Sequence, residues 1–271
     1  MARLPERYSE LYDRAVAVLR SDERVRAVWL SGSLARGTAD AASDLDLLVA
    51  VADEHHGDFA ASWRAWLAAI TPTVLAEEQW FAAGSFWSIT PGFERFDVVV
   101  EPASAIPTTL FPVRVAVFDH DDLSARLPAE RARAPSGTTV AKLVEDWFHF
   151  SAMLEVLLVR EDWLLAAEHL HLLRDLLYKL FVEANQPLPA TGLKRWSEKL
   201  TPGQRDVLAS LPTAATSRSG VVDAHLRLAR AFLGAARPLA RRLDIAWPTA
   251  LEEAATRHLR TVLDVAAPYP A

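Results

Sequence analysis

The first half of the chain is a succession of short apolar segments. Residues 6–21 carry apolar positions at helical spacing, and residues 58–70 predict a second helix. Six segments rich in β-branched or aromatic residues are bounded by Gly, Pro or Ser, which is typical of strands. They are residues 25–31, 44–51, 73–80, 85–90, 96–101 and 113–119. This pattern predicts a mixed α/β domain around one sheet.

The second half of the chain changes to a helical period. Apolar positions from Val140 to Leu158 step by three and four, which predicts a helix. Further helices are predicted over residues 162–184, 193–199, 203–210, 221–243 and 249–265. Residues 126–138 contain two prolines, a glycine and mixed charge without an apolar period, and so predict a linker. We therefore expect an α/β domain at 1–125, this linker, and an all-α helical bundle at 139–271.

Composition excludes several classes of function. The 271 residues are 51% hydrophobic, so the chain can build a globular core. A formal charge of -6 makes nucleic acid an unexpected partner. The chain has no cysteine, so any metal must be held by oxygen or imidazole ligands. No run approaches the ~20 uncharged apolar residues of a membrane span, and we expect a cytoplasmic protein with no membrane partner.

Two aspartates stand at the start of an otherwise apolar strand. In the stretch SDLDLLV, Asp44 and Asp46 project from one face because strand side chains alternate. Ionised carboxylates are costly to bury unless they are paired or bound to metal. Two of them ~7 Å apart on one face can share a divalent cation such as Mg²⁺. A third acid is expected on a neighbouring strand, where FERFDVVVEP offers Asp97.

The turn before this strand has the residues of a phosphate site. Gly32 lets the backbone come close to a ligand, and Ser33 offers a hydroxyl. A short helix from Leu34 to Arg36 would direct free amides at a triphosphate, and Arg36 could add charge. A Walker loop is excluded because Thr38 stands where its lysine should follow, and no G-x-G-x-x-G occurs.

Together, GSLARG and SDLDLLV resemble the nucleotidyltransferase signature of the DNA polymerase β superfamily. A helical bundle after a compact α/β domain is similar to the aminoglycoside and lincosamide adenylyltransferases. The resemblance implies that Gly32 and Ser33 bind the triphosphate, and that Asp44 and Asp46 bind metal. Asp97 matches the third acid of the signature by its position on a predicted strand.

The identity of the general base stays open. Asp97 and Glu101 lie on the same predicted strand face, and some relatives take their base from the helical domain, where Glu145 is the candidate. Lys194, one of four lysines in the chain, follows a loop with proline and glycine and is a further candidate contact to the triphosphate.

The resemblance implies a Mg²⁺-dependent enzyme that transfers AMP from ATP to a hydroxyl of a small molecule. Trp147 and Trp163 are set among acidic residues and are candidate substrate contacts. Such a lining suits a cationic acceptor, so an aminoglycoside-type antibiotic is expected. A lincosamide-like molecule, a protein acceptor and a non-catalytic nucleotide-binding regulatory module are the alternatives. The nucleotide preference and the oligomeric state are not determined by the sequence.

Overall fold

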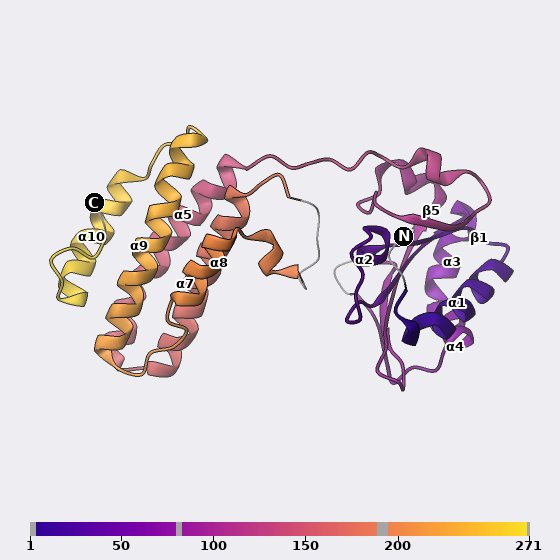
Figure 1. The fold of residues 1–271 in the computed structure, drawn as a ribbon, viewed down its shortest axis with the longest axis horizontal. Helices are drawn as coiled ribbons and strands as arrows, with labels where there is room; N and C mark the ends of the chain where they lie inside the picture. The colour runs from indigo at the N-terminus through magenta and orange to yellow at the C-terminus, as the bar shows by residue number, and fades with distance from the viewer. Residues whose placement is uncertain (1–3, 80–82, 189–194, 270–271) are drawn as a thin grey trace. The chain divides into compact units, whose positions relative to one another are not determined.

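The structure, a computed structural model, describes residues 4–79, 83–188 and 195–269. The chain divides into two compact units, Met1–Arg131 and Ala132–Ala271 (Figure 1). Within the described residues, no helix has the length and hydrophobicity needed to cross a membrane.

The first unit is built on a six-stranded sheet in the order β3-β4-β5-β2-β1-β6. β2 and β5 are parallel neighbours, and the other neighbouring strands are antiparallel. This mixed sheet confirms the predicted fold class, and each predicted strand segment overlaps an observed strand. The strands are β1 (Val25–Leu30), β2 (Leu45–Val51), β3 (Leu75–Glu78), β4 (Ser85–Ile89), β5 (Arg95–Pro102) and β6 (Val115–Asp119).

Eight helices precede, connect or follow these strands in the described part of the first unit. They are η1 (Glu6–Tyr8), α1 (Ser9–Ser21), α2 (Gly32–Ala35), η2 (Asp53–His55), α3 (His56–Ala61), α4 (Trp63–Ile70), η3 (Ala103–Thr108) and η4 (Leu123–Arg126). The single helix expected over 58–70 is wrong, because Ser62 has non-helical backbone angles and separates α3 from α4. This break lets Phe59 and Trp66 stack at 5.5 Å, with the indole donating to the Phe59 carbonyl at 3.1 Å. Burial of both rings therefore overrides the continuous helical pattern.

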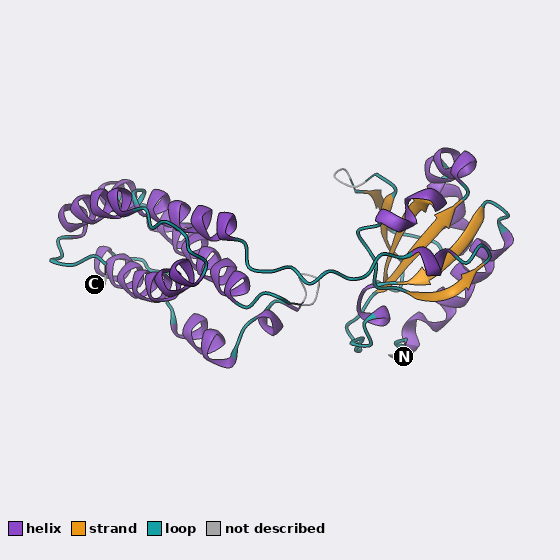
Figure 2. Ribbon diagram, turned by 90° about the horizontal axis from the view of Figure 1, so that it is seen from above, coloured by secondary structure: helices purple, strands orange, loops and turns teal. Residues whose placement is uncertain are grey.

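Helices and loops pack around the sheet of the first unit (Figure 2), and different elements cover its two faces. Leu45, Leu47 and Val49 of β2 point to an apolar core that they share with α1, α3 and α4. The alternate residues point to the opposite face, which η3 and η4 cover in part around the buried Trp29. Because the side chains of a strand alternate, Asp46 lies on this second face, away from α1, α3 and α4.

The second unit is all helical, as its sequence predicts. It contains α5 (Gly137–Ser151), α6 (Leu154–Arg160), α7 (Trp163–Ala184), η6 (Ser197–Lys199), α8 (Pro202–Ser210), α9 (Arg218–Arg242) and α10 (Thr249–Leu263). The pattern expected to continue to Leu158 is broken after Ser151, whose hydroxyl donates to the Trp147 carbonyl at 2.8 Å. Such back-bonding competes with the helical hydrogen bonds and bends the chain. Of the helix expected over 193–199, residues 193 and 194 lie outside the described residues.

Two histidines are buried in the core of the helical unit. His169 lies on α7 and His225 on α9, where the His225 ring stacks 5.9 Å from Trp147. Neither ring nitrogen of either histidine has a hydrogen-bond partner among the residues that the structure describes. Burial lowers the pKa of His169 to about 4 and that of His225 to about 3. Both histidines are therefore neutral in the folded protein at neutral pH.

These pKa values predict an acid-sensitive helical unit. In the unfolded chain a histidine has a pKa of about 6.5. Below that pH the unfolded chain binds protons at these two histidines and the folded protein does not, so the free energy of unfolding decreases as the pH falls. The loss should reach about 2 kcal/mol per histidine by pH 4.5. Denaturant titrations between pH 7 and 4.5 measure it. His225→Leu should remove about half of this loss, because His169 remains, whereas replacement of the exposed His171 by Gln should leave the dependence unchanged.

Candidate active site

Three carboxylates converge at one end of the sheet. Asp46 on β2 is the direct register partner of Asp97 on β5, and Asp44 immediately precedes β2. One carboxylate oxygen from each lies within 4.8 Å of those of the other two, and we call this cluster the acidic triad. The structure thus brings together the three predicted metal ligands. An all-oxygen donor set with this spacing fits a hard divalent cation such as Mg²⁺.

The turn after β1 runs against this triad. The Ser31 amide donates to the Asp46 carbonyl at 3.0 Å, which places the start of α2 beside the carboxylates. Gly32 has a φ of +57°, and a Cβ atom there would lie 2.1 Å from Asp46 Oδ2. Glycine is therefore required for its conformation and for space. Ser33 follows in the first turn of α2, where the amides have no partner within the helix.

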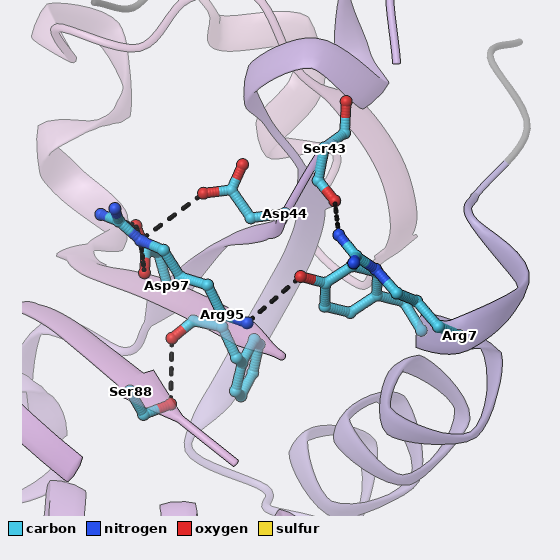
Figure 3. A network of polar contacts seen from close by, with 8 residues as sticks. Arg7, Ser43, Asp44, Ser88, Arg95 and Asp97 are labelled. Atoms are coloured by element: carbon cyan, nitrogen blue, oxygen red, sulfur yellow. Dashed lines mark hydrogen bonds and ion pairs between the residues drawn. The ribbon is translucent and has the colours of Figure 1, made fainter. Parts of the chain in front are cut away.

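Residues from η1 hold the backbone on both sides of the triad (Figure 3). Arg7 donates to the Ser43 carbonyl at 3.2 Å, immediately before Asp44. The Tyr8 hydroxyl accepts from the Arg95 amide at 3.1 Å, at the start of β5. Burial raises the pKa of Tyr8, so its hydroxyl stays protonated. These contacts fix the positions from which the aspartates project.

Arg95 was missed by the sequence reasoning, although it lies against the triad. Its Nη2 is 2.8 Å from Asp97 Oδ2, and its Nε is 3.5 Å from Asp44 Oδ2. The hydrogen bond with Asp97 is the main cause of the raised pKa of Arg95, although burial acts in the opposite direction. The sequence could have indicated this contact, because Arg95 is two residues from Asp97 and so shares its strand face.

Glu101, the rival of Asp97, has a different set of partners. It accepts from Arg114 Nη1 at 3.0 Å and from the Thr109 hydroxyl. The Arg114 side chain is fully covered and lies 4.8 Å over the Trp29 ring, and burial lowers its pKa. Four residues of strand separate Glu101 from Asp97, which is ~13 Å. The structure therefore places Asp97, and not Glu101, in the triad.

Of the two basic residues predicted to contact the nucleotide, Arg36 and Lys194, the structure describes only Arg36. Arg36 Nη1 donates to Glu130 Oε1 at 2.9 Å, so this guanidinium has a carboxylate partner within its own unit. Its contact with a triphosphate stays a prediction. Lys194 lies outside the described residues.

The helical unit contains an open cavity of about 1000 Å³, formed by α5 and the segment that leads into α10. The predicted base candidate Glu145 lines it, with Asp146, Phe150 and Trp247. The expectation that Trp147 contacts the substrate is wrong, because this side chain is fully buried and stacks 4.4 Å from Phe232.

Trp247 was not recognised from the sequence as a residue of this cavity. Its indole donates to Glu252 Oε2 at 2.7 Å, which fixes the orientation of the ring. Trp163, the other tryptophan expected to contact the substrate, is partly buried and packs against the helical core.

Part of the first unit matches a known protein family. Residues 13–76 match the protein family described as "Nucleotidyltransferase domain". The matched stretch includes the Gly32–Ser33 turn and the Asp44–Asp46 pair, and it ends before Asp97. Residues 13–76 therefore match a nucleotidyltransferase domain, which is the class of domain that GSLARG and SDLDLLV predict.

No curated protein matches the sequence. Among solved structures, the chain is similar to the crystal structure of an aminoglycoside 6-adenyltransferase from Bacillus subtilis. The TM-score is 0.45 at 14% sequence identity, over 96% of this chain and 98% of that chain.

The first prediction from the site concerns Gly32. Gly32→Ala should move the Asp46 carboxylate and lower nucleotidyl transfer by at least tenfold, because the added Cβ takes the space of Oδ2. Gly37→Ala is the matched control, since Gly37 also has a positive φ but has no atom within 4 Å of its added Cβ. Both variants should lose about 1 kcal/mol of stability from the left-handed backbone. Equal transfer rates in the two variants would contradict the proposed role of this close approach.

A second prediction separates the two acids of β5. Asp97→Asn should reduce transfer more than tenfold, because removal of a metal ligand costs several kcal/mol of transition-state stabilisation. Glu101→Gln should retain most of the rate and instead lower the melting temperature, because it weakens the pair with the covered Arg114. Steady-state rates and thermal melts of both variants measure these effects. The reverse order of rates would show that Asp97 is not the third ligand.

Proposed function

We propose that the protein is a Mg²⁺-dependent adenylyltransferase that transfers AMP from ATP to a hydroxyl of a small cationic acceptor of the aminoglycoside type. The observation that carries the proposal is the meeting of Asp44, Asp46 and Asp97 within 4.8 Å beside the Gly32 turn. Carboxylates that share divalent ions next to a phosphate-binding turn are suited to transfer of a nucleotide.

In this proposal the residues act mainly by positioning. The three aspartates would hold Mg²⁺, which supplies charge neutralisation at the attacked phosphate and at the leaving pyrophosphate. Ser33 and the first amides of α2 would bind the triphosphate. The acceptor oxygen forms a bond to the α-phosphorus, the bond to the pyrophosphate oxygen breaks, and the hydroxyl proton passes to a carboxylate. Asp97 and Glu145 are the candidates for that base.

The cavity of the helical unit supports a cationic acceptor. Glu145 and Asp146 supply negative charge, and the Trp247 and Phe150 rings supply aromatic surface. Ammonium groups bind to carboxylates and to aromatic faces, so an amino sugar has the chemistry to fit this lining. Lys142 forms an ion pair with Asp146 at the same place, and an incoming ammonium group would compete with it.

A pyrophosphate-release assay with ATP and Mg²⁺ tests the function. Aminoglycosides, lincosamides and a blank are offered separately, with Asp46→Asn as the inactive control. We expect release with an aminoglycoside and transfer of labelled AMP to it. Transfer only to a lincosamide would overturn the proposed acceptor, and label on a protein would point to a protein acceptor. Binding of ATP without release in any reaction would indicate a regulatory module.

A further prediction concerns Glu145. Glu145→Gln should raise the KM for the acceptor several-fold while the KM for ATP is unchanged, or abolish transfer if this residue is the base. The control is Glu168→Gln, an exposed carboxylate on α7 that does not line the cavity. Binding of the acceptor should also weaken with salt, since exposed charges are screened over ~10 Å at 0.1 M. An acceptor KM that neither Glu145→Gln nor salt changes would contradict recognition by charge.

A further inference from the structure

A positively charged side chain of the protein, Arg95, lies against the acidic triad. The Arg95 guanidinium lies 2.8 Å from Asp97 and 3.5 Å from Asp44, so it faces two of the three proposed metal ligands. Figure 3 shows its side chain extending toward Asp97 and Asp44. Like charges at this spacing repel one another, and a positive charge beside them offsets part of that repulsion. Arg95 therefore provides in the protein part of the charge that a metal ion would bring.

The backbone of Arg95 is held while its side chain reaches solvent. Its amide donates to the buried Tyr8 hydroxyl at 3.1 Å, whereas its side chain is 46% exposed. An exposed side chain can change rotamer within nanoseconds. The guanidinium can thus leave the carboxylates without any movement of β5 or of Asp97 on the same strand.

The guanidinium of Arg95 and a divalent ion would both bind to the lone pairs of the Asp97 carboxylate oxygens. Arg95 Nε lies 3.1 Å from both oxygens of Asp97, which is the approach that a metal ion at about 2.1 Å would need. One guanidinium does not neutralise three carboxylates, so negative charge remains to attract a divalent ion. Coordination to Asp97 then requires the guanidinium to move away from it.

We infer that Arg95 is an internal counter-ion of the metal site, and that its guanidinium and the divalent ion are alternative occupants of the edge formed by Asp44 and Asp97. The inference rests on the proposed function, because it takes the triad as the metal site. Arg95 is a positioning residue in this scheme. It balances part of the negative charge of Asp44 and Asp97 until the ion displaces it.

Binding of Mn²⁺ without nucleotide, measured by calorimetry, tests the inference. Arg95→Gln should bind Mn²⁺ about tenfold more tightly than the wild type, which is about 1.4 kcal/mol. Arg95→Lys should fall between them, because it keeps the charge but loses the planar fork. Arg24→Gln is the matched control and should equal the wild type. It removes an arginine–aspartate pair of the same sequence spacing, at 2.6 Å from Asp22 and outside the triad.

A second readout follows the guanidinium directly. In a Mg²⁺ titration monitored by nitrogen NMR, the Arg95 Nε signal should shift and exchange faster with solvent, while that of Arg24 stays unchanged. Equal or weaker Mn²⁺ binding by Arg95→Gln, or an Arg95 signal unmoved at saturating Mg²⁺, would overturn the counter-ion role and leave the metal site standing. Absence of Mn²⁺ binding, or binding that survives Asp44→Asn and Asp46→Asn, would overturn the metal site and the proposed function together.

Discussion

The parallel pairing of β2 with β5 is the constraint on which the site depends. Its register sets Asp46 directly opposite Asp97, and strand alternation adds Asp44 to the same face. Three ionised carboxylates at this spacing repel one another, so the arrangement requires other contacts to hold it. Hydrogen bonds from Arg7 and to Tyr8 hold the backbone around them, and Arg95 supplies a compensating charge.

The division of the sheet into two faces explains how such a cluster is tolerated. One face is apolar and packs against α1, α3 and α4, where burial of aliphatic side chains stabilises the domain. The other face carries the charged groups, and its acids are separated into two sets. Glu101 is neutralised by Arg114 over Trp29, and Asp97 joins the triad. One face of the α/β domain thus carries the larger apolar core, and the other carries the smaller cluster around Trp29 together with the acidic triad.

In the helical unit, the aromatic side chains are divided between core and cavity. Trp147 packs in the core with Phe232 and His225, and Trp247 lines the open cavity with Glu145. Both tryptophans lie near acidic residues in the sequence, so local composition does not distinguish them. Trp147 is buried because it lies on the face of α5 that packs against α9. Trp247 lines the cavity because it lies in the segment that precedes α10.

The sequence by itself determined the class of each half, the six strands, and the Gly32–Ser33 turn with the Asp44–Asp46 pair, because periodicity and short motifs are local properties of the chain. It did not determine that Ser62 divides a helix, that Glu101 is paired with Arg114, or that Arg95 lies across the triad. These features depend on strand register and on side chains that meet from distant segments. Only the tertiary structure decided them, because the energy of a buried ring or an ion pair is set by neighbours in space, which local periodicity does not specify.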